Sequence, residues 1–309
     1  MGRRLRHVLP GKPVEVTNRT FQARYLLRPT AELRPIVLGV LGRVQRQLEM
    51  TIHAFTFASN HFHLILSPND AQHLSDFMGR FEGKLAKEVN RLTGWSGKVW
   101  GDRYHHITIE DSEEAQVERL RYVLAHGVKE GLTRGCSDWP GASCVRALTE
   151  GEPLRGRWYD RTSQHRATRW GREIDEEEFA EDEVVELTPL PCWAHLSEEE
   201  HRQQIQVMIS EIEATEAARH RADGTRPAGV AKILAHHPHE RPKKAKRSPQ
   251  PWFHSRTDDG RKMLRDAYRF FAEAFRDAAE ALKAGELDPP FPEGSFPPGR
   301  PFVPHPAPG

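Results

Sequence analysis

The chain has 309 residues, enough for one large domain or two modest ones, and hydrophobic residues make up 37% of it. No apolar run approaches the roughly 20 residues that a membrane-spanning helix needs, and the basic N-terminus lacks the apolar core of a signal peptide, so we expect a cytoplasmic protein that does not cross a membrane. The three cysteines have no C-x-x-C spacing, which argues against a disulfide framework and against a zinc knuckle.

The net charge of +1 conceals two different halves of the chain. Residues 1–172 hold 27 Lys and Arg against 18 Asp and Glu, whereas residues 173–309 hold 18 against 26. A basic half is what binding to a phosphate backbone requires, although a solvated basic face without a ligand is common. The acidic half is compatible with a role in solubility or in shielding a groove.

Side-chain periodicity divides the first 130 residues into strands and helices in an alternating order. Strands are predicted over residues 13–20, 51–57, 61–67 and 98–109, and amphipathic helices over 30–49, 71–92 and 111–130. Only Ala58-Ser59-Asn60 separates the second and third strands, which is short enough for an antiparallel hairpin. This order predicts an α+β fold with an antiparallel sheet.

The pattern is weaker after Gly131, and we divide the chain into four parts. Residues 1–150 form the first domain, and residues 151–190 are expected to be a basic extension followed by an exposed acidic linker. Residues 191–284 are predicted to be a mostly helical region, with helices over 197–221, 226–234 and 257–284. Residues 285–309 contain nine prolines, so we predict a disordered tail.

His61 and His63 lie one residue apart in a predicted strand, which places two imidazoles on one face of the sheet. Imidazole is the commonest protein metal ligand, so the pair is either a metal site or a pair of structural histidines. Tyr122, His126 and Lys129 recur at helical spacing and share one face of a helix. A tyrosine beside a cation held by imidazoles can attack a phosphodiester and form a covalent phosphotyrosine, whereas an ordinary boundary tyrosine is the alternative.

Four motifs resemble one known family. His61-Phe62-His63, preceded by Asn60 and followed by Leu64-Ile65-Leu66, resembles the histidine-hydrophobe-histidine strand of the HUH single-tyrosine transposases. The stretch from Tyr122 to Leu132 resembles the tyrosine helix of their REP-associated branch. Two further stretches resemble that branch's first strand and the strand before its tyrosine helix: Val16-Thr17-Asn18-Arg19 and Trp100-Gly101-Asp102-Arg103-Tyr104. The resemblance covers about residues 7–150.

This resemblance implies a ferredoxin-like HUH domain that cleaves single-stranded or hairpin DNA with Mg²⁺ or Mn²⁺, as a monomer or a homodimer. Tyr122 would be the nucleophile that leaves a 5′-phosphotyrosine and a free 3′-hydroxyl, and His61 and His63 would be metal ligands. The family's third ligand is a side-chain amide, where this chain has His126, followed by Gly127 in place of proline. Three nitrogen ligands are softer than Mg²⁺ prefers and favour Mn²⁺ or a later transition metal.

Four residues next to the motifs are predicted to contact DNA. Arg19, Arg103 and Lys129 would hold phosphates, and Tyr104 would stack on an unpaired base, although each is equally compatible with a solvated surface residue. The histidine at position 126 motivates a second hypothesis, a DNA-binding protein of the same fold that regulates repeat elements without cleaving them. A third hypothesis is an unrelated metalloenzyme such as a cupin, but this sequence lacks the all-β pattern that a cupin requires.

Overall fold

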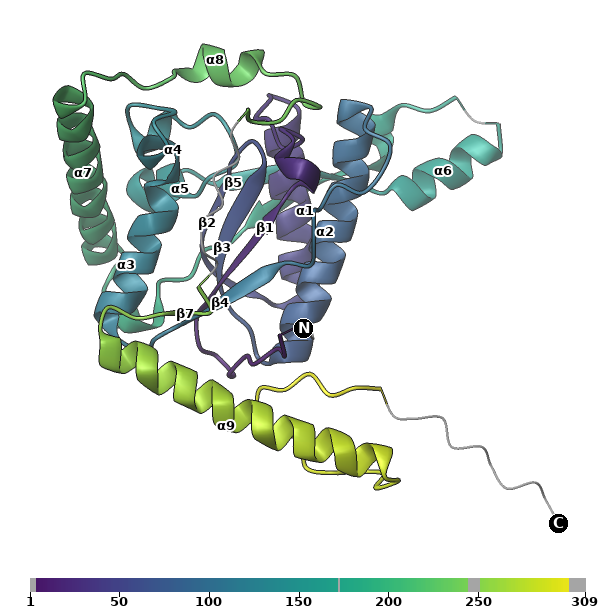
Figure 1. The fold of residues 1–309 in the computed structure, drawn as a ribbon. Helices are drawn as coiled ribbons and strands as arrows, with labels where there is room; N and C mark the ends of the chain where they lie inside the picture. Colours follow the sequence, from purple (N-terminus) through teal and green to yellow (C-terminus); the bar gives the residue numbers. More distant parts are fainter. Residues whose placement is uncertain (1–3, 172, 244–250, 300–309) are drawn as a thin grey trace.

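A five-stranded sheet forms the centre of the molecule, for which the computed structural model describes residues 4–171, 173–243 and 251–299 (Figure 1). The sheet has the order β2-β3-β1-β4-β7, in which all neighbours are antiparallel except β4 and β7. Its strands are β1 (Val14–Arg19), β2 (Thr51–Phe57), β3 (His61–Ser67), β4 (His105–Ile109) and β7 (Phe253–His254).

The first four strands and two helices give a β-α-β-β-α-β order, which with this strand arrangement is the ferredoxin-like fold. The helices of this unit are α1 (Leu33–Leu48) and α2 (Ala71–Thr93), which cover one face of the sheet, while α3 (Glu113–Leu124) lies on the other (Figure 1). The predicted α+β fold with an antiparallel sheet is therefore confirmed, including the hairpin between β2 and β3.

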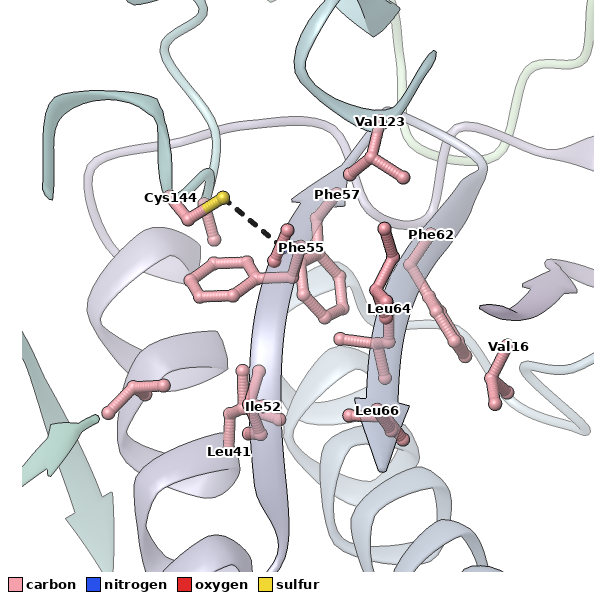
Figure 2. Close-up of a cluster of buried hydrophobic side chains, with 14 of the residues drawn as sticks. Val16, Leu41, Ile52, Phe55, Phe57, Phe62, Leu64, Leu66, Val123 and Cys144 are labelled. Atoms are coloured by element: carbon pink, nitrogen blue, oxygen red, sulfur yellow. Dashed lines mark hydrogen bonds between the residues drawn. The ribbon is translucent and has the colours of Figure 1, made fainter. Parts of the chain in front are cut away.

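The sheet face under α1 and α2 is apolar. Figure 2 shows Phe62, Leu64 and Leu66 of β3 in one cluster with Val16 of β1 and Leu41 of α1. All five side chains are fully buried. Because side chains alternate along a strand, this arrangement confines the two histidines of β3 to the opposite face.

Two element boundaries differ from the prediction. The strand expected over 98–109 begins only at His105, because Trp100 makes a single isolated bridge with Thr20 instead of joining the ladder. The helix expected over 111–130 is interrupted at Ala125, where ψ is −8°, and resumes as α4 (His126–Lys129). Both changes lie next to motif residues.

The acidic segment 173–187, expected to be an exposed linker, has mostly exposed or half-buried side chains but forms secondary structure over most of its length. Strands β5 (Leu154–Tyr159) and β6 (Ala180–Val185) form an antiparallel pair, with α6 (Arg161–Arg169) between them. Glu183 of β6 is 4% exposed and accepts hydrogen bonds from Arg43 at 2.9 Å and Arg46 at 2.7 Å. The acidic residues of this segment thus serve as partners for arginines of α1.

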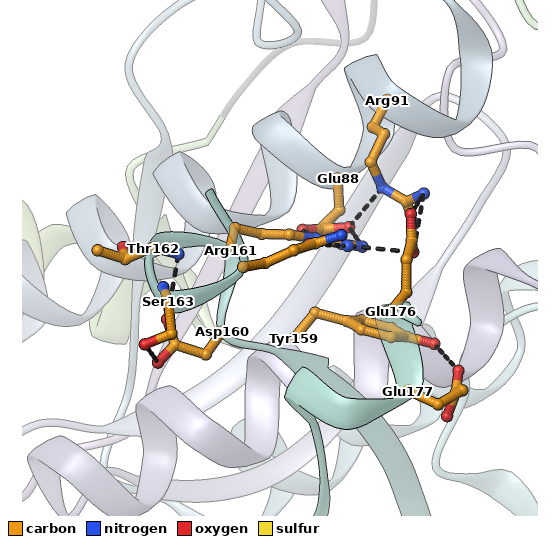
Figure 3. Close-up of polar contacts among 10 residues, drawn as sticks. Glu88, Arg91, Tyr159, Asp160, Arg161, Thr162, Ser163, Glu176 and Glu177 are labelled. Atoms are coloured by element: carbon orange, nitrogen blue, oxygen red, sulfur yellow. Dashed lines mark hydrogen bonds and ion pairs between the residues drawn. The ribbon is translucent and has the colours of Figure 1, made fainter. Parts of the chain in front are cut away.

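An ion-pair network around the buried Glu88 joins this unit to α2 (Figure 3). Glu88 of α2 accepts hydrogen bonds at 2.8 Å from both Nε and Nη2 of Arg161 and one at 3.2 Å from Arg91. Both arginines also contact Glu176, at the start of the 3₁₀ turn η3 (Glu176–Phe179). Burial alone would raise the pKa of Glu88, but the hydrogen bonds and charge of Arg161 outweigh it and lower that pKa.

The C-terminal region is mostly helical, as predicted, although β7 was not expected. Its helices are α7 (Glu198–Ala222), α8 (Val230–Ala235) and α9 (Asp258–Lys283), while the short helix α5 (Val145–Glu150) ends the first 150 residues. Within the described ranges, no helix combines the length and the apolar character needed to cross a bilayer.

The disordered tail predicted for residues 285–309 is only partly covered by the structure, because residues 300–309 lie outside the described ranges. The preceding segment returns to the start of the chain, where the Val8 amide donates to the Gly294 carbonyl at 3.0 Å. The rings of Phe275 and Phe291 also pack together, with centroids 5.2 Å apart. The division of the chain into four parts stays a prediction.

Candidate metal and tyrosine site

The strand register places the polar residues of β1 and β3 on one face of the sheet. Thr17 lies opposite His63, and Arg19 lies opposite His61. Directly opposed side chains project to the same face, and so do residues two positions along. Glu15 therefore shares this face with His61 and His63, across the sheet from the apolar cluster.

Helix α4 brings a third imidazole to this face. The ring centroids of His61 and His63 lie 5.1 Å apart, and that of His126 lies 4.6 Å from the first and 4.9 Å from the second. One candidate ligand nitrogen from each histidine falls within 4.8 Å of the other two. The structure thus assembles the three histidines singled out from the sequence into a group that could hold a metal ion.

Hydrogen bonds orient two of these rings toward the cluster. Glu15 accepts a hydrogen bond from Nδ1 of His63 at 2.6 Å, and Asn60 Oδ1 accepts one from Nδ1 of His61 at 2.7 Å. A ring that donates through Nδ1 carries its lone pair on Nε2, which is then the ligand atom.

The donor set fits a cation, as shown by the orphaned ring nitrogens. Nε2 of His63 and Nε2 of His126 are buried and have no hydrogen-bond partner among the described residues. A buried polar atom left without a partner costs about 1–3 kcal/mol, so such atoms call for an explanation. A divalent ion between the rings would satisfy both.

His61 and His126 are held in the neutral form that binds metals. Burial lowers the pKa of His61 well below its usual value, with the neighbouring histidines adding to the effect. Burial also lowers the pKa of His126 to about 3. Both rings are therefore uncharged at neutral pH.

Tyr122 of α3 stands beside the imidazole cluster and between two cations. Its ring is perpendicular to that of His63, with centroids 5.4 Å apart. The Arg119 guanidinium lies 4.1 Å from the tyrosine ring centroid, and the Lys129 ammonium lies 4.3 Å from it. Burial raises the pKa of Tyr122, and the charge of Arg119 opposes that rise.

A buried carboxylate joins the histidine strand to the tyrosine helix. Glu15 is fully buried, and its second oxygen accepts a hydrogen bond from Nε of Arg119. Burial alone would raise the pKa of Glu15, but His63 and Arg119 outweigh it and bring that pKa to about 2. Neither Glu15 nor Arg119 was singled out from the sequence. The available signals were a lone carboxylate between Val14 and Val16 and an arginine one turn before Tyr122.

Residues 23–124 match the model of the family described as "Transposase IS200 like". The match covers 102 of the 309 residues. The IS200-like segment contains His61, His63 and Tyr122 and ends two residues before His126.

Two solved structures are similar to this chain. One is described as the structure of the REP-associated tyrosine transposase bound to a REP hairpin, with 19% identity, a TM-score of 0.38, and coverage of 50% of this chain and 90% of the other. The second is a putative transposase from Deinococcus radiodurans R1, with 17% identity, a TM-score of 0.28, and coverage of 38% and 95%. The comparison with curated proteins gave no match.

The four residues predicted to contact DNA fall into two groups. Arg19 and Lys129 lie beside the histidines and Tyr122. Arg103 instead donates a hydrogen bond to the Arg4 carbonyl at 3.1 Å, and the Tyr104 ring is only 6% exposed beneath the guanidinium of Arg6. In this conformation Tyr104 offers no ring face on which a base could stack.

The C-terminal region braces the turn that follows His126. Arg219 of α7 donates to the Lys129 carbonyl at 3.0 Å. The amides of Ala228 and Gly229 donate to the carbonyls of Gly131 and Leu132 at 2.8 and 2.9 Å. Residues with no assigned chemistry thus hold α4 in place.

Proposed function

We propose that this IS200-like transposase is a metal-dependent HUH nuclease and strand transferase that cleaves single-stranded or hairpin DNA through a phosphotyrosine at Tyr122. The observation that supports the proposal most strongly is the contact of Tyr122 with His63 inside a cluster of three imidazoles. All four side chains come from the same chain, so a single subunit would hold the complete set.

The three imidazoles would hold one divalent ion, which would act as a Lewis acid on the phosphodiester. His61, His63 and His126 present only nitrogen donors. The carboxylate of Glu15 contacts His63 and does not belong to this group of three donors. Nitrogen ligands suit Mn²⁺ or a later transition metal better than Mg²⁺, which prefers oxygen. We therefore propose Mn²⁺ as the first ion to test.

Cleavage would proceed by attack of Tyr122 on phosphorus. The phenolic oxygen forms a bond to phosphorus, its proton is released, and the bond between phosphorus and the 3′-oxygen breaks. The electron pair of the broken bond stays on the 3′-oxygen, which takes up a proton to become a free hydroxyl. The charges of Arg119 and Lys129 beside the tyrosine ring would stabilise the phenolate as it forms.

Strand transfer would reverse these steps with a second 3′-hydroxyl, which attacks the phosphotyrosine and restores Tyr122. We propose that Arg19 and Lys129 hold the phosphates on either side of the scissile bond, because both lie beside the reacting groups. Arg103 would hold a further phosphate, as the sequence predicts.

The test is a covalent adduct between protein and DNA. Purified full-length chain, Mn²⁺ and labelled hairpin DNA should give a band that survives SDS, and Tyr122→Phe should give none. Tyr159→Phe is the matched control, because the Tyr159 hydroxyl of β5 donates to Glu177 of η3 at 2.9 Å, away from the histidines. Absence of an adduct with the unaltered chain across a broad hairpin library would contradict the proposal.

The second candidate function is DNA binding without cleavage, and His126 is the observation that favours it. This histidine replaces the amide that the family pattern has at the third ligand position. This candidate predicts hairpin binding that is unchanged by Tyr122→Phe and by chelation, together with no adduct under any condition.

A further inference from the structure

A groove of about 500 Å³ lies along α9, outside the histidine and tyrosine site. One wall is formed by β7 and the residue before it, and the other by α9, which runs along the lower edge of the molecule in Figure 1. Nothing in the proposed cleavage uses this surface. Its lining consists of three aromatic rings, one alanine and four arginines: Trp252, Phe253, Tyr268, Ala272, Arg261, Arg265, Arg269 and Arg276.

The arginines form a row on one face of the helix. Arg261, Arg265 and Arg269 are four residues apart, a spacing that places side chains one above another. All four arginines are exposed, and no acidic residue lines the groove.

Two of the four arginines are paired with acidic residues, and two are not paired with any residue that the structure describes. Arg261 is paired with Asp258, and Arg269 lies 3.6 Å from Asp266. Arg265 and Arg276 make no ion pair with any residue that the structure describes. Asp258 also interacts electrostatically with Arg265, but no acidic residue lines the groove, so its lining carries positive charge only.

The aromatic wall is fixed from behind. The Arg4 guanidinium lies 4.7 Å from the Trp252 ring and 5.1 Å from the Tyr268 ring, and Arg4 also donates to the His106 carbonyl at 3.1 Å. The Trp252 and Tyr268 rings meet edge to face, with centroids 5.6 Å apart. Even so, Trp252 is 46% exposed. A rigid aromatic surface of this kind can receive a planar ligand without ordering new side chains.

We propose that this groove binds a segment of single-stranded DNA, with phosphates on Arg265 and Arg276 and a base stacked on Trp252. The inference rests on the proposed function for the kind of nucleic acid, and it adds a second DNA surface to it. Positive grooves with aromatic rings are the general means of holding unpaired strands, since every base has a face that can stack. Duplex DNA or an acidic peptide would contact the arginines but would leave the aromatic rings uncovered.

The test compares binding of a labelled 15-nucleotide poly-dT strand in full-length protein that carries Tyr122→Phe, so that cleavage plays no part. Adding Trp252→Ala and Arg265→Glu should weaken binding roughly fivefold or more, the effect expected for one stacked base. The matched control adds Trp170→Ala and Arg169→Glu on α6, where Trp170 is 82% exposed. This control should leave binding within about twofold of the parent.

A second variant keeps the inference testable if the first destabilises the aromatic wall. Arg265→Glu with Arg276→Glu leaves all three rings intact and changes only exposed side chains, and it should also weaken binding and reduce its dependence on salt. Unchanged binding in this folded variant would overturn the inference. So would an acidic peptide that competes with the oligonucleotide as well as unlabelled poly-dT does.

The two proposals fail separately. If the unaltered chain forms no adduct but the α9 variants still lose binding, the groove stands and the proposed cleavage does not. If an adduct forms but the α9 variants bind poly-dT as the parent does, only the groove is refuted.

Discussion

Glu15→Gln should weaken metal binding and folding together, because this carboxylate connects His63 to Arg119. The amide keeps the size of the side chain, but it cannot accept from both partners without turning its NH₂ group toward one of these donors. Breaking one partner of a buried pair costs about 3–5 kcal/mol. Losing the hydrogen bond that orients a ligating histidine typically lowers metal affinity about 10- to 100-fold.

The assay has two parts: urea unfolding of the metal-free protein, and titration with Mn²⁺ by calorimetry. Glu88→Gln is the matched control, because Glu88 is also buried and bridges two arginines, but it lies on α2, away from the histidines. Both variants should lose stability, and only Glu15→Gln should lose Mn²⁺ affinity. Equal affinity for Mn²⁺ in the two variants would refute the assigned role of Glu15.

Three further predictions concern metal, packing and pH. Mn²⁺ at 100 times its Kd should raise the unfolding free energy of the chain by about 2.7 kcal/mol in denaturant titrations. His63→Ala should abolish that gain, and His165→Ala, at an exposed position, should keep it. No gain in the unaltered chain would contradict the metal site. Gly39→Ala should destabilise the fold by about 1–3 kcal/mol or more in thermal unfolding, because the added Cβ would lie 2.2 Å from the Arg157 backbone. In the control Gly79→Ala, the added Cβ meets nothing within 4 Å, so this variant should stabilise α2 by up to about 1 kcal/mol. Burial raises the pKa of Glu82 to about 7 against the opposing effects of Asn18 and Arg6, so the stability that its neutral form contributes is complete below pH 4.5 and lost by about pH 7. The unfolding free energy of Glu82→Gln should therefore rise relative to that of the unaltered chain by up to about 3 kcal/mol across that window. A difference in unfolding free energy that does not change with pH would refute the shift.

Much of the central sheet could be predicted because its signals are local. The alternation in β3 shows which of its residues face the apolar cluster, and the helical spacing of Tyr122 and His126 shows that they share a face. The meeting of these two faces is observed in the structure. The roles of these residues as ligands and nucleophile stay predictions.

What could not be predicted depends on partners that are distant in the sequence. Glu15 and Arg119 are more than 100 residues apart, and nothing local marks them as a pair. The acidic composition of β6 is typical of a linker until Arg43 and Arg46 of α1 are placed against Glu183. Similarly, the fifth strand is only two residues long and carries no periodicity to detect.

The most direct test of the central claim is to identify the residue that becomes linked to DNA. The adduct formed with Mn²⁺ and hairpin DNA would be digested with protease and nuclease, and the modified peptide sequenced by mass spectrometry. The account predicts a nucleotide joined through its 5′-phosphate to Tyr122, with a free 3′-hydroxyl on the other DNA fragment. A linkage to any other residue, or through a 3′-phosphate, would contradict it.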